Sequence, residues 1–233
     1  MNTIITGATK GIGRALAVLF AQKGFNICVC SRSDVDLEDL KRELTDINSS
    51  IQVFIKNCDV SKKKEVFEFA DFCLKNLQTI DILINNAGVF FPGNIYKEPE
   101  GNLENLIETN LYSAYHLTRK IVPGMIENKR GHIFNLCSVA SINAYDQGGS
   151  YAISKFALYG FSKNLRHELK NYKIRVTAVL PGAVLTESWA GTKLPESRFI
   201  SSDDVANLIY SAWEVSDRTV VEEILIRPME GDI

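Results

Sequence analysis

The feature that most restricts the fold is a regular alternation of two kinds of segment along the whole chain. Short apolar runs of strand length are separated by stretches in which apolar residues recur at helical spacing. The apolar runs lie near residues 3–6, 26–31, 51–55, 81–85, 132–137, 174–180 and 222–226. Such alternation favours parallel strands, because each parallel pair needs a crossover connection, usually a helix. The sequence therefore predicts a Rossmann-like, doubly wound α/β fold, with a seven-stranded parallel sheet and helices on both faces.

The helical segments and the length of the chain indicate one domain. Apolar residues share one helix face over 37–47, over 66–77 and over 205–212. The last of these follows the run Ser-Ser-Asp-Asp at 201–204, which is typical of a helix N-terminal cap. The chain has 233 residues and contains no linker or repeat. We therefore expect a single domain over residues 1–233.

A glycine-rich turn follows the first apolar run and opens a helical pattern. It reads G-x-x-x-G-x-G from Gly7 to Gly13. Glycines between a strand and a helix let the backbone approach a phosphate closely, and the helix N-terminus offers free N–H groups. The spacing differs from the G-x-G-x-x-G pattern, and a turn that serves only close packing is the alternative. The turn is a candidate dinucleotide-binding loop.

A tyrosine and a lysine four residues apart suggest proton transfer. Tyr151 and Lys155 lie on one face if residues 150–172 form a helix. An ammonium beside a phenol favours the phenolate and lowers the tyrosine pKa from its usual value of about 10. Such a tyrosine can exchange a proton with a carbonyl or alcohol oxygen. The same spacing also occurs on ordinary helices, but together with a phosphate loop it indicates hydride chemistry.

Seven landmarks in a fixed order make the chain resemble the short-chain dehydrogenase/reductase family nearly from end to end. They are Thr6–Gly13, Cys58-Asp59-Val60, Asn85-Asn86-Ala87-Gly88, Asn110, Ser138, Tyr151 with Lys155, and Pro181-Gly182 with Thr186. Two departures are small: Cys137 stands where many relatives carry a second serine, and the N-terminus is a few residues shorter than usual.

The resemblance implies a role for each of four catalytic residues. Tyr151 is the general acid in reduction and the general base in oxidation, and Ser138 donates a hydrogen bond to the substrate oxygen. Lys155 binds the nicotinamide ribose and lowers the tyrosine pKa. Asn110 helps to hold a water that relays protons to the lysine, and its position inside a helical segment, where asparagine is a poor helix former, agrees with a functional reason.

The resemblance also implies which residues contact the cofactor. Asp59 accepts a hydrogen bond from the adenine amino group, Val60 packs on the ring, and the backbone near Val184 fixes the nicotinamide carboxamide. The expected contacts are Gly7, Thr9, Lys10, Gly11, Ile12, Gly13, Ser31, Arg32, Asp59, Val60, Asn86, Ala87, Gly88, Tyr151, Lys155, Pro181, Gly182, Val184 and Thr186.

The end of the second apolar run favours NADP over NAD. An NAD site usually carries an acidic residue there, whereas this chain reads Cys30-Ser31-Arg32. Ser31 can donate a hydrogen bond to a 2′-phosphate, and Arg32 can supply charge. Lys10 adds a second cation, and in the family basic residues at these two positions mark NADP-preferring members. The reservation is Asp34, which could contact the ribose if the turn is tight.

The expected substrate pocket is apolar and aromatic. Its walls should come from Phe90-Phe91, Ala140-Ser141-Ile142, Tyr145 and a lid over residues 187–200 that contains Trp189 and Leu194. Arg198 is a lone candidate for binding an anionic group. We therefore expect NADPH-dependent reduction of an apolar ketone or aldehyde, with 3-oxoacyl compounds among the candidates. The alternative is a catalytically idle NADP-binding sensor or partner module, which would have no need of Ser138 or Asn110.

Composition limits the other classes of function. A net charge of -2 gives no reason to expect nucleic acid or a membrane surface, and no apolar stretch approaches the ~20 residues that span a bilayer. The chain begins in strand-like sequence without a secretory signal. Five cysteines without a C-x-x-C pair indicate reduced, buried thiols in a cytoplasmic protein, and the scattered histidines predict no metal site. By resemblance, helices near 103–129 and 150–171 should form the contacts of a homodimer or homotetramer.

Overall fold

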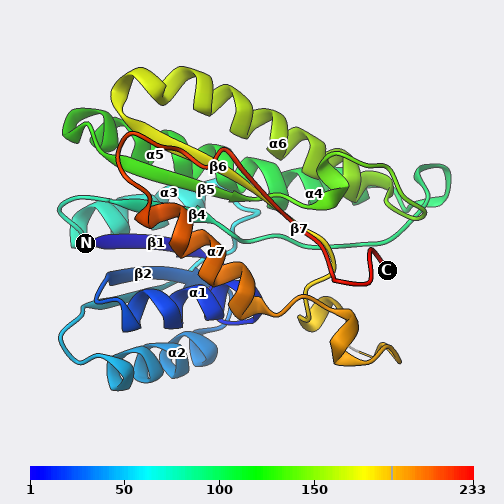
Figure 1. The fold of residues 1–233 in the computed structure, drawn as a ribbon, viewed down its shortest axis with the longest axis horizontal. Helices are drawn as coiled ribbons and strands as arrows, with labels where there is room; N and C mark the ends of the chain where they lie inside the picture. The colour runs from blue at the N-terminus through cyan, green and yellow to red at the C-terminus, as the bar shows by residue number, and fades with distance from the viewer. Residues whose placement is uncertain (190) are drawn as a thin grey trace.

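The described residues of the protein form one seven-stranded sheet. The structure is a computed structural model that describes residues 1–189 and 191–233. The strand order is β3-β2-β1-β4-β5-β6-β7, and every neighbouring pair is parallel (Figure 1). The strands are β1 Asn2–Thr6, β2 Asn26–Ser31, β3 Val53–Asn57, β4 Ile82–Asn85, β5 Gly131–Leu136, β6 Ile174–Pro181 and β7 Glu223–Ile226. The predicted doubly wound fold is confirmed.

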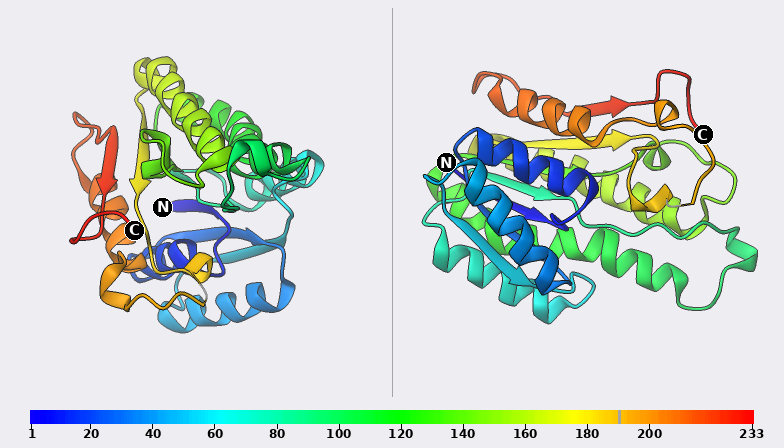
Figure 2. Two further views of the ribbon diagram at one scale, coloured as in Figure 1. Left: turned by 90° about the vertical axis from the view of Figure 1, so that its right-hand side faces the viewer. Right: turned by 90° about the horizontal axis from the view of Figure 1, so that it is seen from below.

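Helices cover both faces of the sheet. Buried side chains of α1, α2 and α7 form one core with one face, and those of α3, α5 and α6 form a second core with the other. Figure 2 (left) shows the blue α2 and the yellow-green α6 on opposite sides of the sheet. The helices are α1 Gly11–Gln22, α2 Asp34–Ile47, α3 Lys63–Asn76, α4 Asn102–Ile107, α5 Ser113–Asn128, α6 Gly149–Leu169 and α7 Ser202–Glu214. The predicted cap of the last helix is present, since Ser201 accepts a hydrogen bond from the Asp203 amide.

Two predicted boundaries differ from the structure. The strand expected at 51–55 is β3, which begins at Val53; Ile51 is buried in the turn before it, so its apolar character did not mark a strand residue. The helix expected over 103–129 is α4, a π-helical turn η2 (Glu108–Tyr112) and α5 in succession. Asn110 is buried in that π-helical turn, and π-helical turns are frequent at functional sites.

The segments after β6 and β7 both fold over the carboxyl edge of the sheet. The loop that follows β6 returns to pair Ile200 with Val184, which closes its base. After β7, the Gly182 amide donates to the Ile226 carbonyl (2.8 Å). Residues 227–233 then lie over the end of β6, near the label C in Figure 1. These two returns add walls to the crevice that an open parallel sheet leaves at its carboxyl edge.

The five cysteines are free and buried, as predicted. Cys28 on β2 and Cys73 on α3 bring their sulfurs within 3.2 Å. Burial raises the pKa of Cys73, which keeps it as a thiol.

Over the described residues, no helix has the length and apolar character needed to pass through a membrane.

Candidate active site and cofactor groove

Two adjoining cavities open at the carboxyl edge of the sheet. The cofactor groove has a volume of about 700 Å³ and lies over the glycine-rich turn and the ends of β2 and β3. The substrate cavity has a volume of about 330 Å³ and reaches Ser138, Tyr151 and Lys155. Asn86 and Gly88 line both, so the cavities join at the end of β4. This is where the strand order reverses, between β1 and β4, which is the usual ligand crevice of a doubly wound sheet.

The glycine-rich turn has a shape that only glycine permits at three positions. Gly7 (φ 65°) and Gly11 (φ 51°) adopt left-handed conformations. A Cβ on Gly13 would lie 2.2 Å from the Gly7 carbonyl oxygen. The Asn86 side-chain amide donates to the carbonyls of Thr6 (2.8 Å) and Gly7 (2.9 Å). Asn86 therefore braces the turn, a role that the sequence alone did not reveal.

The turn and α1 together suit a phosphate group. Helix α1 begins at Gly11, and the side chain of the preceding residue, Lys10, makes no capping hydrogen bond. The fully described first turn of α1 contains no acidic residue. Its first N–H groups and its positive dipole end therefore remain available for an anion. A Cβ on Gly11 would lie 2.9 Å from the Thr186 methyl carbon. The absence of a side chain at residue 11 therefore lets the Thr186 side chain lie close to the turn. The residues present fit the diphosphate of a dinucleotide.

Lys10 and Arg32, the two basic residues predicted to bind a 2′-phosphate, both line the groove. Lys10 lies at its rim in a 2.7 Å ion pair with Glu187, which raises the Lys10 pKa. Arg32 lines the groove and is exposed, and its carbonyl accepts a hydrogen bond from the Asn57 side chain (3.1 Å). Ser31 lines it as well. Both predicted basic residues thus lie at the groove, but Lys10 is paired with the Glu187 carboxylate, which no sequence pattern indicated.

The carboxylate that faces the groove from α2 is Asp36, and not Asp34 as the reservation about the ribose supposed. Ser33 caps α2 by accepting a hydrogen bond from the Asp36 amide (3.2 Å). This cap places Asp36 in the first turn of α2, at the groove. The spacing S-x-x-D is a recognised helix-start pattern and could have identified it.

Asp59 and Val60, which the family resemblance assigns to the adenine, both line the groove. One Asp59 carboxylate oxygen accepts from the Ser61 amide (3.0 Å) and hydroxyl (2.8 Å). The Asp59 amide donates to Glu65 (2.7 Å). The Asp59 side chain is therefore fixed in orientation before any ligand arrives.

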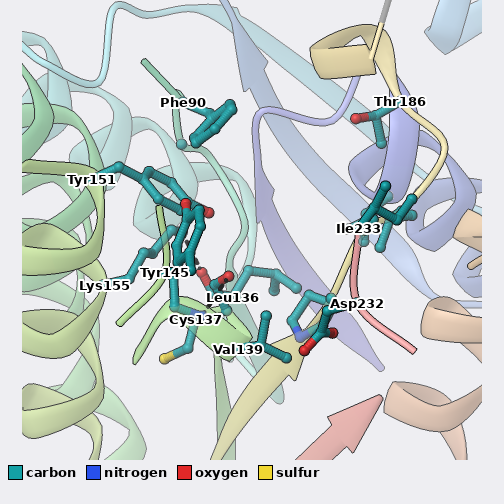
Figure 3. A pocket seen from close by; sticks show the side chains of 18 of the residues that line it. Phe90, Leu136, Cys137, Val139, Tyr145, Tyr151, Lys155, Thr186, Asp232 and Ile233 are labelled. Carbon is teal, nitrogen blue, oxygen red and sulfur yellow. Dashed lines mark hydrogen bonds between the residues drawn. The ribbon is translucent and has the colours of Figure 1, made fainter. Parts of the chain in front are cut away.

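Ser138, Tyr151 and Lys155 all line the substrate cavity. Figure 3 shows Tyr151 and Lys155 on the same side of it. The Tyr151 ring meets the Phe90 ring edge-on, with centroids 4.8 Å apart. The Lys155 ammonium lies 5.8 Å from the Tyr151 ring centroid and donates to the Leu136 carbonyl (2.7 Å). The Ser138 hydroxyl oxygen accepts from the Ala140 amide (3.1 Å), which starts the short helix η3 (Val139–Ser141).

The pKa of Tyr151 does not follow the sequence-based expectation. Burial raises it above its ordinary value of 10, and the Ser138 hydroxyl partly opposes that change. Burial also lowers the Lys155 pKa to about 8. The expectation that Lys155 lowers the tyrosine pKa is wrong for this structure, because the ammonium is directed to the Leu136 carbonyl and the cost of burying a phenolate dominates.

Asn110 braces the site with its side chain. Its carbonyl oxygen accepts from the Val89 amide (2.8 Å), and its amide donates to the Val89 carbonyl (3.0 Å) and the Ser154 hydroxyl (2.9 Å). The loop after β4 is thereby tied to α6, which carries Tyr151. A Cβ on Gly88 would lie 3.1 Å from the Asn110 oxygen and 3.4 Å from the Lys155 nitrogen, so glycine allows this close packing.

Glu98 also anchors α6 and was missed in the sequence. It accepts a hydrogen bond from the Ser150 amide (2.9 Å) and a second from the Ser150 hydroxyl. The Ser150 hydroxyl and amide lower the Glu98 pKa. A carboxylate at a helix N-terminus is favourable, and the serine that this one binds stands one residue before Tyr151.

The walls of the substrate cavity were predicted in part. Phe90, Ala140, Tyr145 and Trp189 line it as expected. Phe91 instead lines the cofactor groove, and Ile142 is 38% exposed outside the cavity. Ser141 does not line the cavity: it is buried, and its hydroxyl accepts a hydrogen bond from the Ser138 amide (3.2 Å) in the turn of η3.

The lid was predicted less well. Within the described part of 187–200, Trp189 lines the cavity while Leu194 is 39% exposed away from it. Arg198 does not reach the cavity, because it pairs with Glu230 (3.3 Å). Residue 190 lies outside the described residues. Several other lining residues had no sequence signal, among them Asn143, Asp232 and Ile233, which come from other turns.

Known proteins resemble this chain over nearly its full length. A family model described as short chain dehydrogenase matches residues 1–196. Sepiapterin reductase of Chlorobaculum tepidum is 32% identical, covering 99% of this chain and 97% of that protein. The 3-oxoacyl-[acyl-carrier-protein] reductase of Thermotoga maritima is 30% identical, covering 88% of this chain and 87% of that protein. The crystal structure of a metagenomic short-chain oxidoreductase in complex with NADP is 30% identical, with a TM-score of 0.85 over 98% of this chain and 97% of that one.

Proposed function

This chain belongs to the short-chain dehydrogenase/reductase family, and we propose that it reduces a ketone or aldehyde to an alcohol with NADPH. The observation that carries the proposal is the junction of the two cavities. A phosphate-binding turn opens one, and Ser138, Tyr151 and Lys155 gather in the other. The NADP in the metagenomic relative and the 3-oxoacyl substrate in the name of the Thermotoga relative support the cofactor and the reaction class.

The groove offers a place for each part of NADPH. The glycine-rich turn and the N-terminus of α1 would hold the diphosphate, and Asp59 with Val60 would hold the adenine. Ser31, Arg32 and Lys10 would hold the 2′-phosphate, in competition with Glu187 for Lys10. The residues expected near the nicotinamide are Pro181, Gly182, Val184 and Thr186. When bound, NADPH supplies the hydride for the carbonyl carbon.

The side chains around the carbonyl supply orientation and a proton. The Ser138 oxygen accepts from the Ala140 amide, and its O–H, which lowers the Tyr151 pKa in the structure, would donate to the carbonyl oxygen when a substrate is bound. The raised pKa of Tyr151 keeps the phenol protonated near neutral pH, as a general acid for reduction requires. The proton on the Tyr151 oxygen passes to the carbonyl oxygen as the alcohol forms.

Between them, Lys155 and Asn110 would bind the cofactor ribose and relay protons to the tyrosine. One of the three Lys155 donors is used by Leu136, which leaves two for a ribose hydroxyl or a water. Both groups of the Asn110 side chain are used on Val89 and Ser154. A proton relay at this position would therefore use the main-chain carbonyl of Asn110.

The substrate, the lid and the assembly complete the proposal. The walls Phe90, Tyr145 and Trp189 suit an apolar carbonyl compound, including a 3-oxoacyl group. We assign the chain to one domain, with residues 187–200 as the lid within it. Exposed Tyr112, the last residue of η2, and Tyr115 in α5 favour a homodimer or homotetramer. The five buried free thiols support a cytoplasmic location.

The test is NADPH oxidation with a panel of ketones, aldehydes, 3-oxoacyl thioesters and sepiapterin. We expect turnover with at least one class, and tighter binding of NADPH than of NADH by fluorescence titration. Binding of NADPH without turnover of any panel member would favour an idle NADP-binding module. Failure to bind either cofactor would overturn the proposal altogether.

A further inference from the structure

The substrate cavity has an acidic end that carbonyl chemistry does not use. Among the described residues that line it, Asp232 is the only side chain with a carboxylate, and Lys155 is the only basic one. The Lys155 ammonium is directed to the Leu136 carbonyl. Asp232 is therefore the charged side chain that the cavity presents to a substrate away from the reacting carbonyl.

Arg227 fixes the position of Asp232. It forms an ion pair with one Asp232 oxygen, Oδ2. It also donates to the side-chain oxygen of Asn143 (3.0 Å), when that amide is oriented so that its nitrogen donates to the Ile142 carbonyl (3.1 Å). The segment after β7 is thus fastened to the loop after η3, and the carboxylate is held in the cavity wall by contacts on both sides.

The second oxygen of Asp232 remains available. A Cβ on Gly182 would lie 3.3 Å from Oδ1 and 3.2 Å from the Pro228 ring, so glycine at 182 lets this oxygen approach the end of β6. Within residues 1–189 and 191–233, Oδ1 has no ion-pair or hydrogen-bond partner. The side chain is 49% exposed and lines the cavity, so a ligand can reach it.

Asp232 lies across the cavity from the reacting groups. Figure 3 shows Tyr151 and Tyr145 on one side and Asp232 on the other. Apolar side chains, Val139 and Trp189 among them, line the space of about 330 Å³. A substrate with its carbonyl at Tyr151 would therefore bring its far end to a carboxylate by way of apolar walls.

We propose that Asp232 determines substrate specificity by accepting hydrogen bonds from a nitrogen group on the end of the substrate remote from the carbonyl. An amine, amidine or guanidine-like group would donate to Oδ1, while Arg227 holds Oδ2. Charge-assisted hydrogen bonds are the strong ones, and a carboxylate on the substrate would instead meet a like charge. This inference rests on the proposed function, because it takes the Tyr151 side of the cavity as the carbonyl site.

Three ketones of one shape test the inference: para-acetylbenzamidine, para-acetylbenzamide and para-acetylbenzoate. For the wild-type protein with NADPH, kcat/KM should fall in that order. Asp232→Asn keeps the shape and removes the charge, so the amidine should lose about tenfold or more and the amide less than about threefold. Glu230→Gln is the matched control, because Glu230 lies in the same segment and pairs with Arg198 outside the cavity. An amidine advantage that survives Asp232→Asn would overturn the inference.

A binding measurement separates this inference from the proposed function. Benzamidine has no ketone, so calorimetric titration into the NADP⁺-saturated protein, and into the protein alone, reports the carboxylate without turnover. We expect Asp232→Asn to weaken benzamidine about tenfold and Glu230→Gln to leave it unchanged. If no ketone is reduced but benzamidine depends on Asp232, the reaction is wrong and the binding site stands. If Asp232→Asn weakens NADP⁺ and not benzamidine, the carboxylate serves the cofactor and the inference fails.

Discussion

The cofactor groove and the substrate cavity meet at the end of β4, yet they are built in different ways. The groove follows the turns at the ends of β1, β2 and β3, with three glycines in the first turn and Asn86 as its brace. The cavity takes side chains from the loops after β4, β6 and β7 as well as from η3 and α6. The groove therefore depends most on the conformation of the glycine-rich turn, while the chemical character of the cavity depends on side chains from segments that are distant in the sequence. Variants in the two regions should separate cofactor binding from turnover.

The sharpest separation should come from the cavity. Tyr151→Phe removes the proton donor and keeps the ring that packs on Phe90. We expect kcat to fall at least about 100-fold, as for loss of a general acid, with NADPH affinity nearly unchanged. Single-turnover rates and a cofactor titration measure the two effects. A phenylalanine variant with near wild-type turnover would show that Tyr151 is not the acid.

The strongest effect on the groove should come from Gly13→Ala. The new Cβ would approach the Gly7 carbonyl to 2.2 Å, so the turn must shift. We expect a loss of stability of about 1–3 kcal/mol, as for overpacking, together with weakened NADPH binding. Chemical denaturation and fluorescence titration would detect both. Gly124→Ala in α5 is the matched control, since a Cβ there meets nothing within 4 Å, and it should be neutral or stabilising. Equal behaviour of the two variants would mean that the turn tolerates side chains.

A smaller and selective change should follow from Arg32→Ala. Loss of one charge-assisted contact should weaken NADPH about tenfold while NADH is barely affected. Ser31→Asp should go further and reverse the preference, because a carboxylate repels the phosphate and can accept from a free 2′-hydroxyl. Affinities for both cofactors, measured for each variant, test this. Equal affinity of the wild-type protein for the two would mean that Asp36, which also lines the groove, dominates this end.

The smallest effect should be that of Glu98→Gln. A neutral amide can still accept from the Ser150 amide but loses its interaction with the positive end of α6. We expect a stability loss of about 0.3–1 kcal/mol and a modest fall in kcat, with unchanged cofactor affinity. Thermal denaturation and steady-state kinetics provide the measurements. If cofactor affinity fell while kcat held, Glu98 would belong to the groove and the division between the two regions would fail.

The same division explains what the sequence could predict. The glycine-rich turn, the strand ends and the Tyr151–Lys155 pair are local patterns, and the structure places them where those patterns indicated. Side-chain partners formed between distant segments were not predictable, such as Glu187 for Lys10 and Arg227 for Asp232. The pKa of Tyr151 was mispredicted for a related reason, since burial depends on the whole fold.

The π-helical turn at Glu108–Tyr112 also bears on which single-codon deletions the chain tolerates. A π-helical turn closes i→i+5 hydrogen bonds where an α-helical turn closes i→i+4 bonds, so this turn holds one residue more than a continuous α-helix needs. Loss of one codon within α5 would rotate the rest of that helix by about 100° and carry part of its buried face, which includes Leu117 and Ile121, toward solvent. Loss of one codon between 108 and 112 would instead convert the turn to α-helix and keep α5 packed as it is, but it would displace Asn110 from Val89. In a library of in-frame deletions, we therefore expect losses at codons 108–112 to yield more soluble protein than losses within α5, and still to lack activity.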